Sequence, residues 1–182
     1  MSRAAQIFWA VFALTMAVYL AMILWSLPHL QQAAGGRVAF DLRPMGYEAT
    51  EARAVVAALG AEGRAFYLNV QHRLDTAYPL LLAVTLTLAF RLLARGWLAG
   101  VLAAIAVLAT VFDYLENSAV AVLLRAGPDA MTDTMVEIAS RWTVLKSATA
   151  SVAFVALIVL LLRAGWRWVR QPQKAALVHP GA

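Results

Sequence analysis

Cysteine is missing from this chain altogether. Its absence excludes disulfides, thiol redox chemistry, cysteine-ligated zinc and iron–sulfur clusters. Charged residues are also scarce, at 14% of the 182 residues against about 25% in a typical soluble domain. Hydrophobic residues reach 63%, well above the soluble average of about 45–50%. The composition therefore indicates a membrane protein, and the length suits one domain.

Motifs for several well-known chemistries are absent as well. The sequence has no glycine-rich phosphate loop and no nucleophile elbow. His72 is a possible metal ligand, but no spacing matches a metal motif, so we expect no metal and no cofactor. The net charge of +5 does not indicate a nucleic-acid partner, because the basic residues flank apolar segments instead of forming one basic face.

Four apolar runs are long enough for membrane-spanning helices, which need roughly 20 residues each. They cover residues 7–27, 75–93, 97–124 and 142–162. The first run is longer than a signal-peptide core, so we expect a retained span, not a cleaved leader. The sequence thus predicts an all-α fold, a four-transmembrane-helix bundle. It forms a single membrane domain over residues 1–170, followed by a disordered tail over residues 171–182.

Basic residues are distributed unevenly around these spans. The N-terminal tip, the turn between the second and third spans, and the C-terminal segment contain no acidic residue, and they carry Arg3, Arg91, Arg95, Arg163, Arg167, Arg170 and Lys174. Positive charge in short segments near span ends marks the cytoplasmic side. The pattern predicts a multi-pass membrane protein with both termini in the cytoplasm, and we expect that membrane to be the bacterial cytoplasmic (inner) membrane.

The segments expected outside the membrane differ in length. The connection between the first two spans is long, and its residues 47–74 favour helix, with a break at Gly60 and a restart near Gly63. We expect this extracytoplasmic helical loop to lie at the outer membrane interface. The connection after the third span is expected to run from Gly127 to Arg141 with a short helix inside it.

Ionisable and polar residues converge near the non-cytoplasmic ends of the spans. In the third span Asp113, Glu116 and Asn117 share one helical face. The second helix supplies a stripe at three- and four-residue spacing, and the fourth span adds Lys146 at its outer end. The candidate ligand-binding residues are therefore Arg64, Tyr67, Gln71, Asp75, Tyr78, Asp113, Glu116, Asn117 and Lys146. Pro79 has no N–H for the carbonyl of Asp75, which leaves that carbonyl as a further acceptor.

Two interpretations of this cluster remain open. Ionisable groups inside a membrane are costly and mark functional sites. Alternatively, Lys146 pairs with Glu116 or Asp113 and the cluster only holds helices together. If the protein is an enzyme, Asp113 and Glu116 are the candidate catalytic residues, because burial makes a carboxyl group a suitable general acid or base.

Four segments carry a resemblance across most of the chain: Phe40–Tyr47, Leu59–Tyr67, Leu74–Pro79 and Phe112–Asn117. Together they resemble a group of small bacterial four-span membrane proteins without an assigned activity. In architecture alone, the chain is also similar to sterol-isomerase-like and sigma-2-receptor-like four-helix membrane proteins. That resemblance implies binding of apolar ligands around intramembrane carboxylates, although a fold by itself does not establish function.

The sequence therefore predicts a membrane protein that binds a lipid or other apolar small molecule from the outer leaflet, with the polar cluster holding its head group. One alternative is a small transporter or ion-coupled subunit. Four short spans are few for such a role, and formation of a homo-oligomer could remedy that. The other alternative is a structural or assembly protein without a small-molecule ligand.

Overall fold

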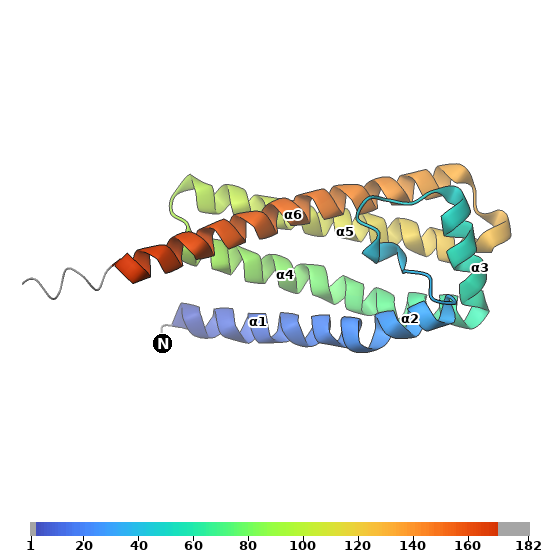
Figure 1. Cartoon of the computed structure of the whole chain (residues 1–182), viewed down its shortest axis with the longest axis horizontal. Helices are drawn as coiled ribbons and strands as arrows, with labels where there is room; N and C mark the ends of the chain where they lie inside the picture. The colour runs from blue at the N-terminus through green and yellow to red at the C-terminus, as the bar shows by residue number, and fades with distance from the viewer. Residues whose placement is uncertain (1–2, 171–182) are drawn as a thin grey trace, which may run out of the picture.

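The computed structural model describes residues 3–170, which form a bundle of long helices without a strand in that range (Figure 1). The predicted tail, residues 171–182, lies outside the described residues. The elements in chain order are α1 (Arg3–Ala21), η1 (Met22–Ser26), α2 (Leu27–Ala33), η2 (Phe40–Leu42), α3 (Ala49–Phe66), η3 (Tyr67–Gln71), α4 (His72–Leu93), α5 (Trp97–Ala130) and α6 (Asp133–Arg170).

The first span was expected to end at Leu27, before Pro28, but the helix continues beyond it. The chain remains helical through η1 and α2 to Ala33, with Pro28 in the first turn of α2. Proline lacks the N–H that a continuous helix donates to a carbonyl of the preceding turn, so an irregular turn is expected just before it. The π-helical turn η1 comes just before it. A π turn rotates the helix face after it, and such turns are frequent at functional sites.

The second long helical stretch begins well outside the predicted span. The chain turns into α3 at Glu48, whose backbone N–H donates to the carboxylate of Glu51 at 3.3 Å. Gly60 interrupts α3 with φ 61°, at the predicted break. The helix then continues through the π-helical turn η3 into α4. In Figure 1, α3 lies across one end of the bundle.

The expected connection from Gly127 to Arg141 is only partly correct, because the helix does break at Gly127 but most of the segment after it is helical. α5 extends to Ala130 and α6 starts at Asp133, so only Met131 and Thr132 separate the two helices. Gly127, with φ 74°, bends the end of α5, and this replaces a longer connection. Because α6 runs on to Arg170, both helices are longer than the predicted spans.

The helices pack in the order α1, α4, α5, α6, with α1 against α4 and α5 between α4 and α6. The start of α1, the end of α6 and the turn at residues 94–96 lie at one end of the bundle (Figure 1). The loop at residues 34–48, α3 and the α5–α6 turn lie at the other end, which is called the α3 end below. This arrangement is an up-and-down four-helix bundle.

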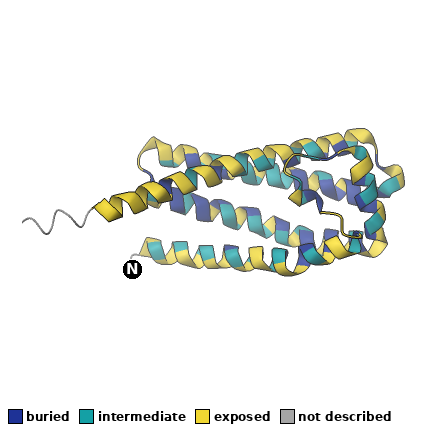
Figure 2. Ribbon diagram, viewed as in Figure 1, coloured by how far each residue is buried: buried dark blue, intermediate teal, exposed yellow. Residues whose placement is uncertain are grey.

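Two apolar cores fill the bundle. Near the α3 end, buried side chains from α3, α5, α6 and the loop surround Phe40 and Tyr67. Toward the opposite end a smaller core contains Leu86, Phe90 and Leu102. Exposed positions run along the outward faces of the long helices (Figure 2), and many of them are leucine, isoleucine and valine. All four helical stretches are long and apolar enough to cross a membrane.

Candidate functional site

Lys146 of α6 lies at the centre of a charged cluster near the α3 end. Its ammonium is 3.8 Å from Asp41 Oδ1 and 3.8 Å from Asp113 Oδ2, and it forms an ion pair with Glu116. The lysine side chain is only 14% exposed. Three carboxylates from two different parts of the chain thus share one buried ammonium. We call these four residues the Lys146 cluster.

Glu116 is the most deeply buried member of the Lys146 cluster, with a side chain that has no exposed surface. Its second partner comes from α6, because Thr143 Oγ1 donates to Glu116 Oε1 at 2.5 Å. Thr143 and Lys146 are three positions apart, so they lie on one face of α6 and both meet α5 there. A buried carboxylate with both a cation and a hydroxyl donor is well compensated.

Asp41 is the member of the Lys146 cluster that the candidate set missed. It lies in the short 3-10 helix η2, where Phe40 is fully buried and anchors the loop in the core. Tyr67 donates its hydroxyl hydrogen to Asp41 Oδ2 at 2.6 Å. Helix periodicity cannot predict how residues 34–48 fold back. The available signal was an acidic residue between Phe40 and Leu42 in an otherwise apolar stretch.

A second branch of the polar network lies on α4, η3 and η1. Gln71 Nε2 donates to both carboxylate oxygens of Asp75 at 3.0 Å. Ser26 Oγ in turn donates to Gln71 Oε1 at 2.6 Å. Ser26 and Gln71 belong to η1 and η3, so the two π-helical turns meet through this hydrogen bond. All three side chains are buried.

Asn117 connects this branch to the Lys146 cluster. Its Nδ2 donates to the backbone carbonyl of Asp75 at 3.0 Å and to Asp113 Oδ1 at 3.2 Å. The carbonyl of Asp75 is the acceptor freed by Pro79, so α5 satisfies a group that α4 cannot satisfy itself. The Pro79 carbonyl also receives a hydrogen bond from α5, from Thr110 Oγ1 at 3.0 Å.

Tyr47, in the loop before α3, packs on Phe40 beside the Lys146 cluster, with 4.8 Å between the ring centroids. Its hydroxyl is buried and has no hydrogen-bond partner of good geometry among the described residues. Burial raises the pKa of the Tyr47 phenol well above its usual value; Thr143 opposes the rise, and Glu116 and Asp41 reinforce it. Tyr47 therefore stays protonated and brings a hydrogen-bond donor to the cluster.

A small cavity of about 30 Å³ extends from the Lys146 cluster between α4, α5 and α6. Asp113 and Lys146 form its polar end. Small side chains form much of its wall, namely Ala83, Ala106, Ala109, Ala150 and Ala153. The cavity has room for at least one water molecule and none for a larger ligand unless the helices separate.

The structure brings together six of the nine candidate ligand-binding residues. Tyr67 is a seventh, which joins the site through its hydrogen bond to Asp41. The six are Gln71, Asp75, Asp113, Glu116, Asn117 and Lys146. Arg64 and Tyr78 lie apart from this network. Arg64 donates a hydrogen bond from Nε to the carbonyl of Gly60 and lies against Gly127. Tyr78 stacks on Tyr19, with 5.8 Å between the ring centroids. Within residues 3–170 no group of three His, Asp or Glu side chains is arranged to hold a metal ion.

Comparisons with known proteins do not extend this description. No family model, no curated protein and no solved structure matches the chain. The resemblance to small four-span membrane proteins therefore stays an expectation, and the Lys146 cluster is the feature of the molecule that bears on function.

Proposed function

We propose that this chain is a multi-pass protein of the bacterial inner membrane that binds a lipid or other apolar small molecule by its head group at the Lys146 cluster. The termini lie in the cytoplasm and the α3 end faces the other side. The observation that carries the proposal is the buried convergence of Asp41, Asp113 and Glu116 on Lys146, with a cavity beginning at Asp113 and Lys146. Intramembrane ionisable groups with such a position mark ligand or ion sites.

Charge balance indicates the chemistry of the head group. One ammonium compensates one of the three carboxylates around it, and the remaining negative charge needs protons or a cation. A ligand with a protonated amine, or failing that a hydroxyl, supplies the missing donor. A carboxylate or phosphate head group adds like charge and is disfavoured.

The apolar part of the ligand is proposed to lie between α4 and α6. Alanines line the cavity there, and α4 and α6 contact each other less closely than either contacts α5. Small residues allow helices to separate or approach with little loss of packed side chain. The ligand would enter from the membrane by widening this cavity, with its head group at Asp113.

Transport is the weaker alternative, because the polar network is confined to the α3 end. Toward the opposite end, an apolar core around Leu86, Phe90 and Leu102 fills the space between the described helices. Its polar neighbours there include Thr15 and Thr85, which bond to each other at 2.8 Å. A carrier needs a polar path that reaches both sides. A purely structural role is the other alternative, and the following experiment separates it from ligand binding.

The test is mass spectrometry of small molecules that co-purify with the wild type and with Asp113→Asn. Asparagine keeps the shape and removes the charge. We expect a discrete amine- or hydroxyl-bearing amphiphile in the wild type, and at least tenfold less of it in the variant, because hydrogen bonds to charged groups contribute roughly 1.5–3 kcal/mol.

Asp133→Asn is the matched control. Asp133 is 79% exposed and pairs with Arg53 at 2.6 Å, away from the cluster. This variant should retain the amphiphile at the wild-type level. The same bulk lipids in all three proteins, each folded, would contradict ligand binding and favour the structural role.

A further inference from the structure

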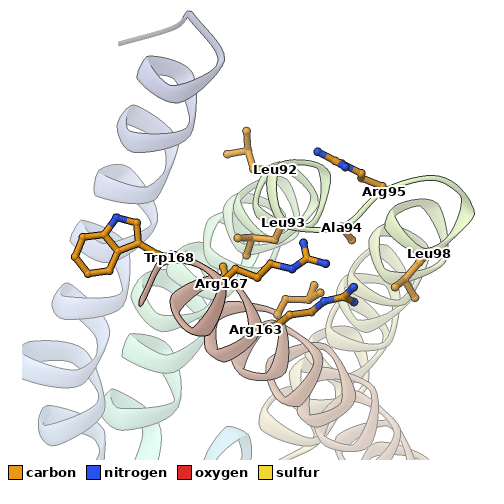
Figure 3. A pocket seen from close by; sticks show the side chains of 10 residues that line it. Leu92, Leu93, Ala94, Arg95, Leu98, Arg163, Arg167 and Trp168 are labelled. Atoms are coloured by element: carbon orange, nitrogen blue, oxygen red, sulfur yellow. The ribbon is translucent and has the colours of Figure 1, made fainter. Parts of the chain in front are cut away.

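A second hollow lies at the opposite end of the bundle from the Lys146 cluster. It has a volume of about 560 Å³ and lies between the α4–α5 turn and the last turns of α6. Arg95, Arg163 and Arg167 line it, and Figure 3 shows their guanidinium groups around the same opening. The sequence analysis used these arginines only as markers of orientation.

None of these three arginines has an acidic partner within residues 3–170. The ion pairs of the described chain involve Arg43, Arg53, Arg141 and Lys146 instead. Residues 3–40, 76–112 and 138–170 contain no aspartate or glutamate, so the described part of this end of the bundle carries no acidic side chain. Guanidinium groups that converge without a carboxylate are suited to an anion from outside, above all a phosphate with its several oxygens.

The rest of the hollow is apolar. Leu92, Leu93, Leu98, Leu160 and Trp168 line it beside the arginines. These side chains continue into the outward apolar faces of α5 and α6, where Val101 and Leu161 are exposed. A free phosphate ion would meet these leucines without benefit, whereas a phosphate attached to acyl chains would use both parts of the hollow.

We propose that this hollow, the arginine hollow, binds the phosphodiester head group of an anionic phospholipid, with the acyl chains along α5 and α6. Basic pockets between helix ends on the cytoplasmic side are suited to anionic lipid head groups. The proposal rests on membrane insertion with this end in the cytoplasm. It does not depend on the Lys146 cluster, so either proposal can fail without the other.

Basic residues that only mark the cytoplasmic side could lie anywhere around the end of the bundle. Arg95, Arg163 and Arg167 instead line one hollow. Arg163 and Arg167 are four positions apart on one face of α6, and Arg95 reaches the same hollow from the α4–α5 turn. Arg91 does not line the hollow, and Arg170 lies over the ring of Trp166 at 3.8 Å. These two provide an internal control of equal charge.

The experiment titrates delipidated protein in detergent with dioleoyl phosphatidylglycerol and follows bound lipid by native mass spectrometry. Dioleoyl phosphatidylcholine is the zwitterionic comparison. We expect R163Q/R167Q to bind phosphatidylglycerol roughly thirtyfold more weakly than the wild type, at about fivefold for each arginine. R91Q/R170Q loses the same charge and should stay within threefold of the wild type.

R163K/R167K keeps the charge and therefore tests geometry even if the glutamine variant fails to fold. It should bind several-fold more weakly than the wild type, because lysine lacks the planar fork that grips two phosphate oxygens. Equal losses in R163Q/R167Q and R91Q/R170Q would overturn the proposal, as would equal binding of both lipids by the wild type. Saturable binding of inorganic phosphate that displaces phosphatidylglycerol would identify a free-phosphate site and would overturn it too.

Discussion

At the scale of single residues, Lys146 is the position on which the site depends. Its ammonium is the cation that contacts Asp41, Asp113 and Glu116. Removing one partner of a buried ion pair leaves an uncompensated charge, which costs about 3–5 kcal/mol, whereas removing both partners can be neutral. Variants of Lys146 therefore measure the contribution of the cluster to stability, whereas Asp113→Asn tests ligand binding.

Lys146→Met is predicted to lower the free energy of unfolding by about 3–5 kcal/mol, because it leaves three carboxylates around an apolar side chain. Unfolding by denaturant in a mild detergent measures the change. Arg141→Met is the control, since the pair of Arg141 with Glu137 is exposed and contributes at most about 1 kcal/mol.

The double variant Lys146→Met with Glu116→Gln should recover part of this loss, because the amide removes one of the uncompensated charges and still accepts from Thr143. If Lys146→Met were as stable as the wild type, the ion pairs described for Lys146 would be contradicted.

At the scale of elements, the loop before α3 decides whether Asp41 reaches the cluster. Tyr47 donates its backbone N–H to Ser140 Oγ of α6 at 2.9 Å, which ties the loop to the bundle. Gly46 has φ 84°, and a Cβ there would lie 2.5 Å from the same Ser140 Oγ. This position therefore requires glycine for both its backbone angle and its close approach to α6.

Gly46→Ala is predicted to displace the loop from α6 and to weaken the contact between Asp41 and Lys146. The free energy of unfolding should fall by about 1–3 kcal/mol. Hydrogen exchange should become faster at residues 39–48 and stay unchanged in α5.

Gly100→Ala is the control for Gly46→Ala. A Cβ at Gly100 would meet nothing within 4 Å, and the residue lies inside α5, so alanine should stabilise the helix by up to about 1 kcal/mol. Unchanged exchange at residues 39–48 in Gly46→Ala would contradict the described anchoring of the loop.

Elements were more predictable from the sequence than their connections. Long apolar runs predicted the four helices, and Gly60 predicted the break in α3, because both signals are local. The connection expected from Gly127 to Arg141 was only partly right: the chain does break at Gly127, but the charged residues after it lie on exposed helix faces instead of outside a helix. Likewise, the spacing of Asp113, Glu116 and Asn117 predicted their shared face, whereas Asp41 depends on a tertiary fold-back.

Two candidate residues lie outside the network because the helix that carries them is irregular. Arg64 and Tyr78 fit the polar stripe of the second helix, but periodicity was counted as if the helix were regular. The break at Gly60 and the π-helical turn η3 change which side of the stretch faces α5. Arg64 consequently turns back to the carbonyl of Gly60, and Tyr78 meets Tyr19 of α1.

At the scale of the whole molecule, the two ends of the bundle differ in chemistry. The Lys146 cluster, rich in carboxylates, lies near the α3 end, and the arginine hollow lies at the other. Between the two ends, exposed positions follow the long helices (Figure 2), and many of them are large apolar residues. This arrangement suits a membrane protein whose positively charged end lies in the cytoplasm. Both proposals depend on this orientation.

The most direct test of the account is therefore the accessibility of single cysteines in bacterial spheroplasts, since the chain has no cysteine of its own. Met45, 91% exposed, lies at the α3 end, and Trp97, 79% exposed, lies at the opposite end. With a membrane-impermeant maleimide, Met45→Cys should be labelled in intact spheroplasts and Trp97→Cys only after permeabilisation. Labelling of Trp97→Cys without permeabilisation, together with protection of Met45→Cys, would contradict the orientation and both proposed sites with it.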